Sequence, residues 1–133
     1  MSVEYGGYTC LMVAVMTDHI DICRLLIDKG AQIDAKNWIA LTPLHLAADS
    51  GLIEIVRLLC DHGADIEAQS ILRRRPLHEA AFKGHIYVVK ELIEERNAEI
   101  NARIDDGRTA LSLAGQQNKP DVAAYLVSHG GIY

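Results

Sequence analysis

Apolar residues recur along the chain as pairs of short helical patterns, with turn residues between them. After Pro43, small and apolar side chains follow at helical spacing up to Gly51, and a second apolar stripe begins at Ile53. Thr42 and Pro43 are typical of a helix start, because the hydroxyl caps backbone N–H groups and proline needs no donor there. Glycine at Gly63 ends the second helix. The pattern predicts helices over residues 10–16, 20–28, 43–49, 53–61, 76–82, 86–95, 110–116 and 120–128.

These helix pairs are copies of one unit. Residues 42–47 read TPLHLA and are matched 33 residues earlier by residues 9–14 and 33 residues later by residues 75–80. The fourth copy, residues 109–114, begins 34 residues further on, and one residue inserted before Asn97 accounts for the difference. A helix pair of this size cannot bury its apolar face alone, so the copies must stack into one continuous core. The chain is predicted to be a single domain, residues 1–133, with repeats near 4–36, 37–69, 70–103 and 104–133.

The unit has a family resemblance. TPLHLAA at residues 42–48, followed by Gly51, by IVRLL at residues 55–59 and by GADI at residues 63–66, closely resembles the ankyrin repeat. The resemblance covers nearly the whole chain. It implies an all-α fold, a solenoid of stacked helix-turn-helix units joined by β-turn loops, with atypical capping units at its ends. Single turn or cap positions depart from the pattern, namely Cys10, Asp18, Arg73, Arg75, Ala110 and Asn118.

Whether the four copies form a complete domain or a piece of a longer array is left open by the resemblance. The complete domain is our expectation, because the end repeats depart most from the pattern, as capping units do.

Composition narrows the range of functions. The chain carries 18 acidic and 13 basic side chains, a formal net charge of −5, which disfavours binding to nucleic acid and to anionic lipid. Three widely spaced cysteines, Cys10, Cys23 and Cys60, form neither a disulfide framework nor a zinc motif, which favours a reducing compartment. The apolar run at residues 10–16 is far shorter than the ~20 residues that cross a bilayer. We expect an intracellular protein, cytoplasmic or also nuclear, with no nucleic-acid or membrane partner.

Catalytic and metal-binding motifs are not found in the sequence. His45 and His78 occupy the same repeat position, and the resemblance implies that they bond backbone groups of neighbouring turns. The sequence HEAAF begins like the zinc motif HExxH, but Phe82 stands where the second histidine is needed. Cys23 and Cys60 fall on helix faces, where free thiols act as small apolar groups. We therefore predict no enzyme activity, no catalytic residue, no metal site and no cofactor.

The turn tips carry the candidate binding residues. The resemblance implies that the tips and the exposed side of the first helices line a concave face. In the first three repeats these positions are unusually apolar, and Trp38 is the only tryptophan of the chain. Solvated turns gain nothing from Trp, Ile or Leu, so this patch favours a protein-binding site. The predicted partner-binding residues are Tyr5, Tyr8, Met16, Trp38, Ile39, Leu41, Ile71, Leu72, Arg74, Phe82, Lys83, Asp105 and Arg108.

Within this set, we expect different roles. The apolar anchors are Trp38, Ile39, Leu41, Ile71, Leu72 and Phe82, and Arg74 is the charged contact. For the aliphatic anchors the alternative is packing against adjacent turns. The basic run at residues 73–75 either pairs with acidic groups of a ligand or is a solvated turn.

The sequence thus predicts a non-catalytic protein–protein interaction module that binds a protein partner through its concave face. One alternative is self-association into a homodimer, through the apolar groove or through helix faces exposed at an end of the array. The other alternative is a rigid spacer within a larger scaffold.

Overall fold

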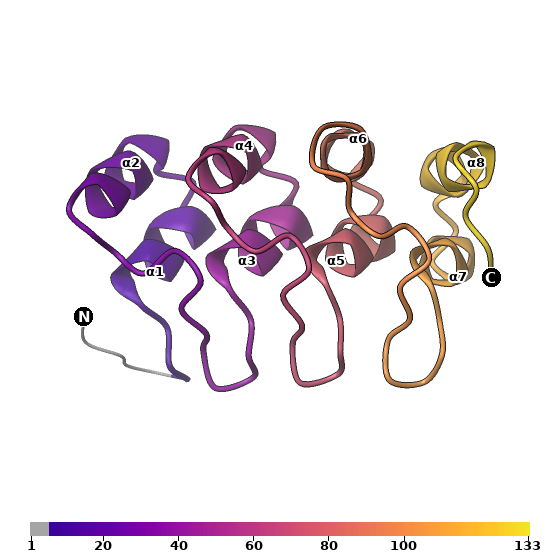
Figure 1. Ribbon diagram of the computed structural model, residues 1–133, viewed down its shortest axis with the longest axis horizontal. Coiled ribbons are helices and arrows are strands. Elements are labelled where there is room, and N and C mark those ends of the chain that lie inside the picture. Colours follow the sequence, from indigo (N-terminus) through magenta and orange to yellow (C-terminus); the bar gives the residue numbers. More distant parts are fainter. Residues whose placement is uncertain (1–5) are drawn as a thin grey trace.

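The computed structural model describes residues 6–133, and these form four helix pairs stacked side by side (Figure 1). The pairs are α1 Cys10–Met16 with α2 Ile20–Asp28, α3 Pro43–Ser50 with α4 Ile53–Asp61, α5 Pro76–Lys83 with α6 Ile86–Lys90 and η1 Glu91–Glu95, and α7 Ala110–Gln116 with α8 Pro120–Ser128. The first helices make one layer and the second helices another, and the loops between repeats, here called fingers, extend from the first layer to one side (Figure 1). The expected all-α solenoid is confirmed. Within the described residues, none of the helices has the length and apolar character needed to cross a membrane.

Threonine begins most of the first helices, as the sequence predicts. The hydroxyls of Thr42 and Thr109 accept hydrogen bonds from backbone N–H groups three residues further on, at 3.3 and 3.2 Å. The third repeat has Arg75 at this position, which brings no hydroxyl cap. Its guanidinium Nη1 instead contacts the carboxylates of Glu67 at 3.1 Å and Glu99 at 2.9 Å. At this position, an ion-pair network therefore joins consecutive fingers.

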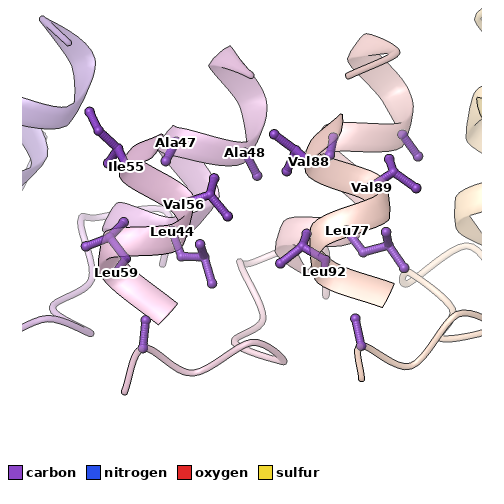
Figure 2. Packing of buried hydrophobic residues seen from close by; sticks show 14 of the residues in the cluster. Leu44, Ala47, Ala48, Ile55, Val56, Leu59, Leu77, Val88, Val89 and Leu92 are labelled. Atoms are coloured by element: carbon purple, nitrogen blue, oxygen red, sulfur yellow. The ribbon is translucent and has the colours of Figure 1, made fainter. Parts of the chain in front are cut away.

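The core runs through the whole stack without a break. Figure 2 shows Leu44 of α3 and Leu59 of α4, and one unit further on Leu77 and Leu92, all of which belong to one buried apolar cluster. Ala47 is fully buried, and its small side chain lets neighbouring helices approach closely. Because every helix pair packs against the next, the core fixes the spacing of the fingers.

The extra residue of the third repeat is accommodated inside its second helix. The chain leaves α6 at Lys90 and continues as the π-helical turn η1. In the second repeat the N–H of Ala64 bonds the carbonyl of Leu59 at 3.0 Å, and in the third Ala98 bonds Leu92 at 2.8 Å, one residue further apart. A π turn widens a helix by one residue and leaves the closing bond in place. The predicted insertion is thus confirmed, whereas the expectation of one regular helix over residues 86–95 is corrected.

One position of the finger tip has a left-handed backbone in all four repeats. In the first and fourth repeats this residue is glycine, Gly7 at φ +84° and Gly107 at φ +90°. In the second and third repeats it is Ala40 at φ +63° and Arg73 at φ +61°. A side chain with a Cβ is strained in this conformation by about 1 kcal/mol. The sequence identified the departure at Arg73 and missed the one at Ala40.

Replacing Arg73 by glycine is expected to raise the free energy of unfolding by about 1 kcal/mol, because glycine adopts φ > 0 without strain. The arginine side chain is exposed, so little packing is lost. Chemical denaturation measures the difference. Arg73→Lys is the matched control, since lysine keeps both the charge and the strain; equal stability of the glycine and lysine variants would contradict the prediction.

Candidate protein-binding surface

Backbone hydrogen bonds join neighbouring finger tips into a row. The bonds between fingers run from the N–H of Trp38 to the carbonyl of Gly6 at 2.8 Å, from Ile71 to Ile39 at 3.1 Å and from Asp105 to Leu72 at 3.0 Å. Each finger is also closed on itself, for example by the N–H of Ser70 bonding the carbonyl of Arg74 at 2.9 Å. The tips therefore form one continuous, ordered edge.

Four exposed apolar side chains occupy the middle of this edge. We call Trp38, Ile39, Ile71 and Leu72 the apolar tip patch. Trp38 is 74% exposed, the largest exposure of the four. Ile39 and Leu72 are about half exposed, so packing against adjacent turns covers these aliphatic side chains only in part. Four such side chains on consecutive fingers make a contiguous apolar surface.

The backbone of the first finger supports the ring of Trp38. A Cβ added at Gly7 would lie 2.5 Å from Cδ1 and 2.9 Å from Nε1 of the indole, so the ring rests directly on this glycine. The indole is thus held in position while most of its surface faces solvent. A ring that is already oriented loses little freedom when a partner binds it.

The other predicted residues differ in their exposure. Met16, at the end of α1, is exposed, and Phe82 of α5 is half-buried. Lys83 is exposed, and its Nζ lies 3.2 Å from the carboxylate of Asp49. Tyr8 and Leu41, which occupy equivalent finger positions, are half-buried. Tyr5 lies outside the described residues.

The last finger is polar. Asp105 is exposed at its tip. The guanidinium of Arg108 lies 2.9 Å from the carboxylate of Asp106 and donates to the side-chain carbonyl of Gln116 at 2.6 Å. Both partners of this side chain therefore belong to its own repeat. The edge therefore changes from apolar to acidic along the stack.

Arg74 also has internal partners. Its guanidinium lies 3.1 Å from the carboxylate of Glu79, and its Cζ lies 4.9 Å from the centre of the Phe82 ring. The side chains of Arg74 and Glu79 are only 17% and 13% exposed. Burial raises the pKa of Glu79, and the neighbouring arginine opposes that shift. Arg74 thus connects the third finger to α5, and its role as a charged contact with a partner stays a prediction.

His45 and His78 connect each first helix to the next finger. His78 Nδ1 accepts the N–H of Arg75 at 2.9 Å, and Nε2–H donates to the carbonyl of Ala102 at 2.9 Å. His45 Nδ1 likewise accepts the N–H of Thr42 at 3.1 Å, while its Nε2 lies 2.8 Å from a different carbonyl of the next finger, that of Arg74. Both rings are buried, and burial lowers both pKa values, that of His78 to about 4. The expected structural role of these neutral histidines is confirmed.

Comparison with known proteins agrees with this geometry. The family model for ankyrin repeats (3 copies) matches residues 2–70 and again residues 67–133. The chain belongs to the ankyrin repeat family. It is also 40% identical over 45 residues to protein fem-1 homolog A-like from Mus musculus. That match covers 34% of this chain and only 7% of the mouse protein.

Ankyrin repeats are generally protein–protein interaction modules, and the family is typically non-enzymatic. In this ankyrin stack, burial raises the pKa of Cys60 to about 11 and also raises that of Cys23, so both thiols are poor nucleophiles at neutral pH. Among residues 6–133, His, Cys, Asp and Glu side chains form no group of three or more that fits a metal ion.

Proposed function

We propose that this ankyrin stack is a non-catalytic interaction module that binds a segment of a partner protein across its finger tips. The observation that carries the proposal is the exposure of the apolar tip patch. Water-exposed loops gain no stability from such side chains, and aromatic residues in a contiguous apolar patch are typical of binding hot spots. The family's general role in protein recognition supports this interpretation.

The edge also favours a particular kind of partner. Its middle is apolar, and Asp105 gives the following tip an exposed negative charge. A segment with large apolar side chains, followed by a basic residue opposite Asp105, matches both features. Such a change of character along the row fixes the direction in which the segment lies.

Truncating the patch is expected to weaken partner binding at least tenfold, because loss of a hot-spot side chain costs about 2 kcal/mol. The wild-type chain and a Trp38→Ala/Leu72→Ala variant are compared by affinity capture from lysate of the source cell. Tyr87→Ala is the matched control, since Tyr87 is 73% exposed on α6, in the layer away from the fingers. Circular dichroism checks that all three chains keep their helices.

A protein retained by the wild type and by Tyr87→Ala, but lost from the double variant, supports the proposal. Binding to purified partner is then followed directly by Trp38 emission, which shifts to shorter wavelength when the indole leaves water. Capture of the same proteins by all three chains would show that the patch is not the binding surface.

A further inference from the structure

The first helix pair exposes positions that every later repeat buries. Ile22 of α2 is 47% exposed, whereas its equivalents Ile55, Val88 and Val122 are each 1% exposed. In those repeats another helix pair precedes the one that carries the position (Figure 1). No helix pair precedes α1 within residues 6–133.

Three further positions of the first repeat are more exposed than an equivalent in a later repeat, although the second and third equivalents of Val13, Leu46 and Glu79, are only partly buried. Leu25 is 54% exposed, whereas Leu58 is 7% exposed at the equivalent position of the second repeat. Cys10 is exposed where Pro43 is buried, and Val13 is exposed where Leu113 is fully buried. We call Cys10, Val13, Ile22 and Leu25 the open end face. Its shape and apolar character match those of a surface that receives a helix pair of this same fold.

At the opposite end of the stack, the last residues of the chain are bonded to the fourth repeat and the finger before it, although Val127, Ile132 and Tyr133 stay exposed. The hydroxyl of Thr109 donates to the carbonyl of Ile132, and the N–H of Ile132 bonds the side chain of Asn101 at 2.9 Å. These bonds hold the last residues against the fourth repeat. The Tyr133 ring lies 3.7 Å from where a Cβ on Gly115 would be. A second copy that stacked head to tail would have to displace this tail.

We propose that the open end face is covered by the open end face of a second copy, giving a two-fold symmetric homodimer. The occupant must present an apolar helix pair, and within residues 6–133 the pair with this exposed apolar face is α1 with α2. Pairing two copies of α2 in antiparallel fashion places Ile22 of one against Leu25 of the other. A closed two-fold pair is also the commonest symmetric arrangement, whereas head-to-tail stacking generates open filaments.

The charges beside the face are compatible with this arrangement. Asp21 and Arg24 are both exposed on α2 and carry opposite charges. A two-fold axis between antiparallel helices brings the same flank of both copies together. Asp21 of one copy then lies on the same side as Arg24 of the other, which favours this register over a parallel one.

The dimer leaves the finger tips exposed in both copies. Two apolar tip patches on one particle bind a partner with two sites more tightly than one patch does, through effective concentration. The dimer adds to the proposed function and does not depend on it.

Light scattering or sedimentation over a wide concentration range tests the dimer with the full chain. The wild-type mass is expected to rise from 14.6 kDa towards twice that value. Leu25→Asp is expected to remain monomeric at all concentrations, because a carboxylate would be buried at the centre of the interface. Val127→Asp is the matched control, since Val127 is 57% exposed on α8 at the other end, and this variant should dimerise like the wild type.

A second readout uses Cys10, which the dimer covers. Its alkylation is expected to slow as the wild-type concentration rises, and to keep one rate in Leu25→Asp. A wild-type chain that stays monomeric at every concentration overturns the proposal. The open end face would then be a site for an unrelated helical partner. Loss of the dimer in Val127→Asp would show that the interface lies at the other end of the stack. Loss of the dimer in Trp38→Ala would show that it lies at the apolar tip patch.

Discussion

Acidification from pH 6.5 to pH 4 is expected to lower the free energy of unfolding by up to about 3 kcal/mol through His78 alone. Burial holds the pKa of this ring at about 4, below its ordinary value of 6.5. Between these two pH values the unfolded chain binds a proton that the folded chain excludes, so stability falls as the pH falls. His45 adds to the loss in the same direction.

Urea denaturation at a series of pH values measures this effect, with His78→Leu as the test variant. At pH 7 the variant should be less stable by about 3 kcal/mol, because the Arg75 N–H and the Ala102 carbonyl lose their partner. Its stability should also depend less steeply on pH than that of the wild type. His129→Leu is the control, since His129 is exposed at the end of α8 and lies outside the contacts between repeats. Parallel pH profiles for His78→Leu and the wild type would exclude His78 as the cause.

Replacing Arg74 alone by leucine is expected to lower the free energy of unfolding by about 3 kcal/mol, because Glu79 is left buried without its cation. The loss should diminish as the pH is lowered, since protonation of Glu79 removes the unpaired charge. Its pKa is already raised by burial, and without Arg74 it rises further.

The second repeat indicates a second substitution that should restore the stability lost in Arg74→Leu. Leu41 and Leu46 stand at the positions of Arg74 and Glu79. The double variant Arg74→Leu/Glu79→Leu is therefore expected to be about as stable as the wild type, because replacing a buried ion pair by apolar residues is often neutral. Chemical denaturation of both single variants and the double variant completes the cycle. Additive losses would mean that the two side chains do not act as a pair.

Much of the fold follows from features of the sequence that are local and repeated. Threonine caps, the apolar spacing and the glycine stops recur in each unit, so the helix boundaries agree with the structure to within one residue outside the π turn. The apolar tip patch was also predictable, because Trp38 and Ile71 occupy the same finger position in consecutive copies.

What the sequence did not predict depends on contacts within a single repeat. Arg74 belongs to a basic run, and only the fold shows that it turns towards Glu79 and Phe82. The signal was present in the repeat alignment, where an arginine and a glutamate replace two leucines together. The left-handed backbone of Ala40 had a signal in the same alignment, because glycine stands at the equivalent positions Gly7 and Gly107.

The π turn of the third repeat lets the repeat be one residue longer without changing how it stacks on the next repeat. An added residue in η1 stays within one helix, and the next unit begins with its usual threonine cap and closing bonds. The second-helix layer is thus a place where natural variants of this protein can gain or lose a residue while the finger row keeps its spacing. In the fingers, where His45 and His78 reach fixed carbonyl groups, a length change of the same size would break contacts in two repeats at once. Insertions that accumulate among relatives should therefore concentrate in the second-helix layer, on the side facing away from the fingers.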